Sequence, residues 1–248
     1  MTIDDVRATI IEQAREWDFR VTDDQSWIIP TGAPLEDAVE IVSDVLVTDM
    51  ISRSLVMGGL HIATHGMWFD SARGRFAIWP SMTIARTAAI GAARALHIMS
   101  GPTRLARRVA ALQILNIEAE GLMGMATDLR DRGETDAAAP LIQTAQANKV
   151  EVGDALEALG GKRGSRMTDL AMLSNAARYF GDNEARAREE IELHWRYSSG
   201  SAHASSYVWN SDLWTRPADQ QLAAAWSLPM QLLEVAWDQW NIGLGRQP

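Results

Sequence analysis

The chain has 248 residues, of which 47% are hydrophobic and 22% charged, and this balance excludes an intrinsically disordered protein. It contains no Cys, which excludes a disulfide framework, a thiol nucleophile and metal sites built on thiolates. The formal net charge of −9 argues against broad, sequence-independent binding to duplex nucleic acid or anionic lipid. The acidic first residues differ from a signal peptide, and the most apolar stretch, 55–69, is interrupted by glycines and two His, so we expect a cytoplasmic protein without a membrane span.

Apolar residues at helical spacing dominate the chain and predict an all-α fold. We expect a helical bundle of about seven or eight helices that includes one long antiparallel hairpin. No Pro-rich, Ser-rich or single-sign charged stretch marks a linker, which favours a single domain over 1–248. Within it, 1–80 would supply N-terminal helices and a loop, and 81–248 the main bundle.

The first elements are two helices separated by a loop. Thr2 and Asp5 have the spacing of a helix N-cap pair, and the apolar pattern that follows predicts a helix over 2–17. Three Pro and Gly residues within 18–34 predict a loop, with room for one short strand. A second helix is expected to start at Leu35 and to bend or end at the glycine pair 58–59.

A short continuation of this helix carries His61 and His65, and a turn over 70–80 would lead into the next helix. Two His at i and i+4 share one helix face and could hold a metal ion, but Ile62 stands where zinc hydrolases have Glu. No third ligand is indicated. We therefore expect two His with local hydrogen bonds, no metal site and no cofactor.

The middle of the chain predicts a central helix followed by the hairpin. Residues 82–99 are crowded with Ala and Gly, which allows close helix packing near the centre of a bundle. After a Ser-Gly-Pro stop, two amphipathic stretches, 103–132 and 135–159, predict the arms of the hairpin. The glycine-rich stretch 160–164 ends the second arm; we interpret it as a loop, and a modest anion contact is the alternative.

Three further helices are predicted over 168–180, 183–206 and 218–244. In the last of them, residues at alternating steps of four and three form one apolar stripe: Trp226, Met230, Leu233, Trp237 and Trp240. This stripe fits a core face, and a subunit interface is the alternative because aromatic residues are enriched at interfaces.

The segment 196–207 breaks the apolar pattern. If it is helical, Arg196, Ser199, His203 and Tyr207 lie on one face together with Gly200, and that face is polar where a core stripe should be apolar. Ser and Gly are also poor helix formers, so local rules are broken here together, as happens at functional sites. The residues could hold a phosphate or carboxylate, exchange a proton near neutral pH and orient a ligand. A tight helix crossing with locally paired polar groups is the purely structural alternative.

The Arg196–His203 spacing, on a late helix of an all-α chain, resembles the Arg-x(4–6)-His element of the HEPN superfamily. The surrounding sequence LHWRYSSGSAHASSY also resembles related helical proteins with a Ser-x-x-x-His stretch. The resemblance covers the helices from Met82 onward. It implies a homodimer that brings two motifs together and cleaves RNA without metal, with His203 in proton transfer and Arg196 on the phosphate.

Two functions follow from this resemblance. The first is a metal-independent endoribonuclease of the toxin or phage-defence kind, with Arg196 and His203 catalytic and Ser199 and Tyr207 binding the ligand. The second is a non-catalytic HEPN-like module that binds a nucleotide, a small anion or a partner protein, such as an antitoxin. Tyr197 keeps the second open, because many active members have Asn, Asp or His after the Arg. For the homodimer, we predict a two-fold interface built from the C-terminal helices, with the Trp stripe and the small residues around Gly200.

Overall fold

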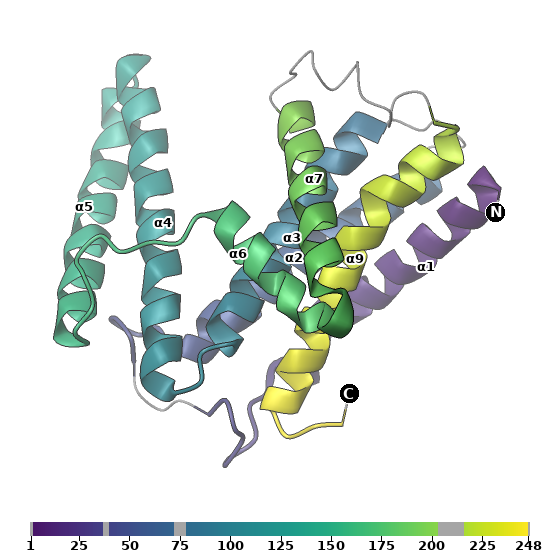
Figure 1. Ribbon diagram of the computed structural model, residues 1–248. Helices are drawn as coiled ribbons and strands as arrows, with labels where there is room; N and C mark the ends of the chain where they lie inside the picture. The colour runs from purple at the N-terminus through teal and green to yellow at the C-terminus, as the bar shows by residue number, and fades with distance from the viewer. Residues whose placement is uncertain (1, 37–39, 72–77, 203–215, 248) are drawn as a thin grey trace. The chain divides into compact units, whose positions relative to one another are not determined.

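The computed structural model describes residues 2–36, 40–71, 78–202 and 216–247 (Figure 1). Apart from an isolated bridge between Val42 and Val45, the regular structure in this part of the chain is helical, which confirms the predicted all-α class. The α-helices are α1 Ile3–Thr22, α2 Val47–Ser71, α3 Ile78–Met99, α4 Arg104–Asp131, α5 Thr135–Ala158, α6 Asp169–Ala176, α7 Glu184–Ala202 and α9 Ala218–Gly243, with the 3₁₀ helices η1 Asp24–Trp27 and η2 Ala177–Asn183.

The helices belong to two compact units, and each is built from separate stretches of sequence. Unit 1 contains Met1–Glu36, Ile51–His97 and Asp169–Pro248. Unit 2 contains Asp37–Met50 and Ile98–Thr168. The single domain expected from the sequence stays a prediction.

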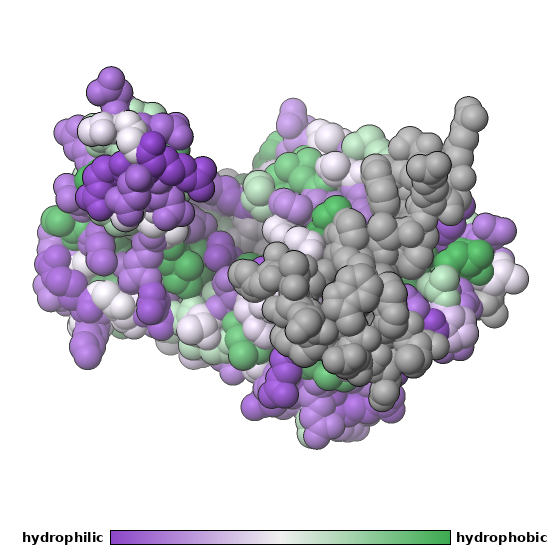
Figure 2. Space-filling model, turned by 90° about the horizontal axis from the view of Figure 1, so that it is seen from above, coloured by the Kyte–Doolittle hydropathy of each residue, from purple (hydrophilic) through white to green (hydrophobic). Residues whose placement is uncertain are grey.

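Unit 2 is built around the antiparallel pair α4 and α5, which lie side by side in Figure 1. The Thr103 side chain accepts a hydrogen bond from the Ala106 N–H at 3.1 Å and caps the start of α4. Gly133, at φ +85°, forms the turn between the arms, in a conformation that favours glycine. The predicted hairpin is thus confirmed with its ends within one residue. Hydrophilic side chains cover much of its visible surface (Figure 2).

Unit 1 joins the first helix of the chain to the last. Thr2 and Asp5 form the expected capping box, and α1 continues to Thr22, beyond the predicted end at Trp17. Its buried face packs against α9. Within α9, the Trp stripe is mostly buried in its own chain: Trp226, Met230, Leu233 and Trp240 are at most 3% exposed. The core interpretation of these four residues is therefore the one that the structure supports. The small residues of α3 are buried as well, as predicted.

The predicted start of the second helix is wrong, and of the two outcomes predicted at the glycine pair, a bend or an end, the end is not found. The helix starts at Val47 rather than Leu35, because 40–46 form a turn in which Asp44 has φ +57° and the Asp49 carboxylate accepts from the Leu46 N–H. The helix then passes through Gly58 and Gly59 without ending. A Cβ at Gly58 would lie 2.9 Å from Leu233 Cδ2, and one at Gly59 only 2.6 Å from Trp17 Cε3. The two glycines therefore allow close packing and do not stop the helix.

In the described part of the chain, none of the helices combines the length and the apolar character that crossing a bilayer requires.

Candidate functional sites

The polar segment, which starts at Arg196, begins on the last turns of α7. One face of these turns is buried and the other is exposed. His194 and Ser198 are buried, and His194 Nε2 donates to the Ala225 carbonyl at 3.2 Å. Burial lowers the pKa of His194, and the hydrogen bond to Ala225 opposes this effect. Arg196 is exposed and Ser199 is half-buried. The other two predicted site residues, His203 and Tyr207, lie outside the described residues, so the structure does not test whether all four meet.

A second cation from α3 approaches this part of α7. The Arg86 guanidinium carbon lies 4.3 Å from the centroid of the Trp195 ring, within the range of a cation–π contact. Arg86 is half-buried, and its Nε has no hydrogen-bond partner among the described residues. The described residues also supply no carboxylate that pairs with it. Sequence reasoning missed Arg86, because it lies in a stretch whose only clear signal is small core residues.

The two halves of α7 differ in charge. In the first half, Arg186 pairs with Glu190 at 2.9 Å and Arg188 with Glu184 at 2.6 Å, both at i,i+4 spacing on the surface. From Trp195 to the end of α7 the sequence contains no carboxylate. Arg86, which pairs with no carboxylate of the described residues, therefore brings a positive charge to this end of the helix in a chain that is acidic overall.

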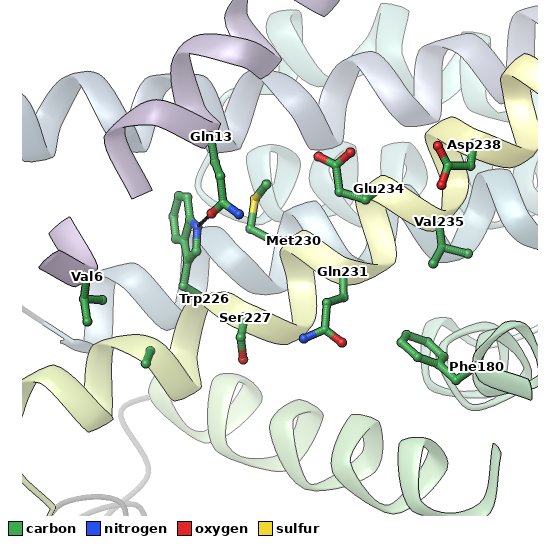
Figure 3. Close-up of a pocket in the computed structure, with 11 residues that line it drawn as sticks. Val6, Gln13, Phe180, Trp226, Ser227, Met230, Gln231, Glu234, Val235 and Asp238 are labelled. Carbon is green, nitrogen blue, oxygen red and sulfur yellow. Dashed lines mark hydrogen bonds between the residues drawn. The ribbon is translucent and has the colours of Figure 1, made fainter. Parts of the chain in front are cut away.

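A separate cavity of about 450 Å³ opens along α9, where α1 and η2 flank it (Figure 3). Its lining residues are Val6, Gln13, Phe180, Ala223, Trp226, Ser227, Met230, Gln231, Glu234, Val235 and Asp238. Eight of them follow one stripe of α9 from Ala223 to Asp238, which makes the cavity an elongated groove. Its volume lies in the range of small-molecule sites, about 300–1,000 Å³.

Polar groups in the groove are held by neighbours on α1. Trp226 Nε1 donates to Gln13 Oε1 at 2.9 Å, and Figure 3 shows the amide nitrogen of Gln13 on the Met230 side. Glu234 accepts from Trp17 Nε1 at 3.0 Å and from Arg20. The sequence signal that could have found this groove is the polar stripe beside the Trp stripe of α9, which recurs at steps of four, three and four: Ser227, Gln231, Glu234 and Asp238.

His65 packs beneath the groove, its ring centroid 5.3 Å from that of Trp226. It is 1% exposed, and burial lowers its pKa from 6.5 to about 4, so the ring is neutral near pH 7. On the preceding turn, His61 Nδ1 lies 2.7 Å from the Met57 carbonyl oxygen. The described residues contain no group of three or more His, Asp and Glu side chains able to hold a metal ion.

Comparisons with protein-family models, with curated proteins and with solved structures gave no match.

Proposed function

We propose that the chain binds RNA at the C-terminal end of α7 and cleaves it as a metal-independent endoribonuclease. Arg196 holds the phosphate, His203 transfers the proton, and Ser199 and Tyr207 orient the strand. The observation that carries the proposal is the Arg86 guanidinium stacked on Trp195, the neighbour of Arg196, with no carboxylate partner in the described part of the chain. The proposed enzyme is cytoplasmic, of toxin or phage-defence type, and works as a homodimer.

The chemistry of these residue types supports the proposal. A guanidinium is charged at every physiological pH and presents a planar set of donors that matches two phosphate oxygens. Two such groups near a helix end without carboxylates can attract one phosphodiester even though the whole protein carries a net charge of −9. Single-stranded RNA suits a local site of this kind, because its bases and phosphates can be held one at a time.

The same cations favour a second function from a different class. Arg86 and Arg196 would hold a nucleotide, a small anion or an acidic segment of a partner protein whether or not His203 acts on it. A non-catalytic HEPN-like module, with an antitoxin or other protein as its partner, therefore remains the alternative proposal.

An RNA cleavage gel combined with fluorescence-polarisation binding separates the two proposals. We expect the wild type to cleave a fluorescent single-stranded RNA in the presence of EDTA, and His203→Ala to bind it without cleaving. Arg196→Ala and Arg86→Gln should each weaken binding about tenfold or more, which corresponds to a lost charged hydrogen bond. Binding without any cleavage by the wild type would support the non-catalytic module.

Arg186→Ala is the matched control, because it removes one guanidinium from the same helix, where Glu190 already pairs with it. It should change RNA binding less than twofold. If Arg186→Ala weakened binding as much as Arg196→Ala, attraction would depend on net charge alone and both proposals for this site would fail.

A further inference from the structure

The groove along α9 lies on other elements than the proposed RNA site and has a different charge. No Lys, Arg or His is among its lining residues, whereas two carboxylates, Glu234 and Asp238, lie one turn apart at one end. A phosphate or other anion would be repelled at that end. The groove therefore needs a ligand other than the one proposed for α7.

Only one of the two carboxylates is compensated. The Arg20 guanidinium donates to both oxygens of Glu234, and the same guanidinium also pairs with Glu16. Asp238 is exposed and receives no hydrogen bond or ion pair from the described residues. The Arg20 guanidinium thus pairs with two carboxylates, Glu234 and Glu16, while the nearby Asp238 carboxylate has no such partner among the described residues. This end of the groove is therefore negative and favours a cation.

The rest of the groove is apolar at its floor and polar at its mouth. Val6, Trp226 and Met230 are nearly fully buried and line the floor, while Ser227 and Gln231 are exposed. Figure 3 shows Trp226 and Met230 on the α1 side of α9 and Gln231 on the side of η2. A ligand that fills this groove must therefore have an apolar body that reaches the floor.

The shape sets the distance between the two ends of the ligand. Met230 and Asp238 are separated by about 12 Å along the helix at 1.5 Å per residue. We propose that the groove binds a linear organic ammonium ion, with its aliphatic body over Met230 and Val235 and its charged nitrogen at Asp238. An ammonium group donates three hydrogen bonds and can use the Asp238 carboxylate together with the outer face of Glu234.

Isothermal titration of the 248-residue chain at low salt tests the proposal with three eight-carbon probes: octylammonium, octanol and octanoate. We expect octylammonium to bind about tenfold more tightly than octanol, and octanoate to bind most weakly, because the three share an aliphatic chain and differ in the charge and hydrogen-bonding groups of the head. Equal affinity of the three probes, or no measurable binding of octylammonium, would overturn the proposal.

Charge-matched variants locate the nitrogen of the ligand. Asp238→Asn should weaken octylammonium about three- to tenfold and leave octanol unchanged. Glu189→Gln removes the same charge from an exposed position on α7 and should leave both affinities unchanged. If the two variants had the same effect, octylammonium would be responding to net charge and the site would be wrong.

Substitutions that fill the groove test where the aliphatic body of the ligand binds. Ser227→Trp and Gln231→Trp each add a large side chain at an exposed position, where folding should tolerate it. Each should abolish binding of both octylammonium and octanol, with the helical circular dichroism unchanged. Retention of octylammonium binding in both variants would overturn the proposal, and RNA binding at α7 should be unchanged in either case.

Discussion

The Arg20 guanidinium on α1 donates to both carboxylate oxygens of Glu234 on α9, at 2.9 and 2.8 Å, across 214 residues of sequence. The same guanidinium lies over the rings of Trp17 and Trp237, at 4.9 and 5.3 Å from their centroids. One side chain thus connects the first and last helices through charge, hydrogen bonds and aromatic contacts.

Replacing Arg20 by Lys should lower the free energy of unfolding by about 1–2 kcal/mol. Lys keeps the charge but loses the second guanidinium nitrogen, which donates to Glu16 while Nη1 donates to Glu234, and it loses the planar contact with the rings. Arg188→Lys is the control, since its pair with Glu184 is exposed on both sides and should be worth at most about 0.5 kcal/mol. Urea unfolding measures both variants, and equal losses would mean that the Arg20 contacts contribute nothing beyond a surface ion pair.

Stability should fall with acid because of His65. Burial lowers its pKa from 6.5 to about 4, so the folded protein keeps the ring neutral while the unfolded chain protonates it. The contribution is complete above pH 6.5 and is lost as the pH falls toward 4, to a total of about 3 kcal/mol.

The variant His65→Phe should therefore lose less stability than the wild type between pH 7 and pH 4.5. His61→Gln, one turn away, serves as the control and should keep the wild-type pH dependence. Urea unfolding at a series of pH values gives both slopes. Parallel curves for His65→Phe and the wild type would show that the ring has the same pKa in the folded protein as in the unfolded chain, against the effect expected of burial.

A pair of glycine variants should change stability in opposite directions. A Cβ at Gly91 would lie 2.5 Å from the Ser54 carbonyl oxygen, against backbone that cannot rotate away. Gly91→Ala should therefore destabilise the protein by about 1–3 kcal/mol. Gly124, within α4, has open space at its Cβ position, so Gly124→Ala should stabilise by about 0.5–1 kcal/mol through helix propensity. Destabilisation of equal size in both would contradict the close α2–α3 contact.

The homodimer implied by the HEPN resemblance stays a prediction. Four residues of the Trp stripe are buried in their own chain, so the interface must use other residues. Ser199, half-buried near the end of α7, is a candidate, and Ser199→Trp should raise the dissociation constant of the dimer. Light scattering at tens of micromolar measures the mass, and a monomeric wild type at that concentration would contradict the prediction.

The sequence predicted correctly those helix ends that are set by residues close to them in the chain. The arms of the hairpin end at a Thr cap and at glycines with positive φ, and these residues act on their own neighbours in sequence. The alternative that Gly58 and Gly59 end the helix is wrong, because their contacts are with Leu233 and Trp17, far away in sequence. The same glycine that stops one helix allows another to cross closely, and only the fold decides between the two.

The residues of the candidate sites differ in the same way, between those predicted from spacing on one helix and those brought together by contacts between helices. Arg196 and Ser199 follow from their spacing on one helix, whereas Arg86 reaches Trp195 from another helix and has no periodic signal of its own. The groove on α9 was also not predicted from the sequence. Its floor residues belong to the Trp stripe, which predicts a core, and only α1 and η2 turn the polar side of that stripe into a cavity.

Hydrogen bonds between the two ends of the chain also determine how late in synthesis folding can be completed. Arg246 donates to the carbonyl oxygens of Gln25, Ser26 and Ile28, and Trp240 Nε1 donates to that of Ser26. During synthesis, α1 is complete long before these residues exist, by about 10–40 s at ordinary elongation rates. In that interval the apolar face of α1 lacks its partner on α9. Until α9 is made, the apolar face of α1 must be kept from other contacts. In contrast, α4 and α5 are adjacent in sequence and can pair as soon as both have left the ribosome.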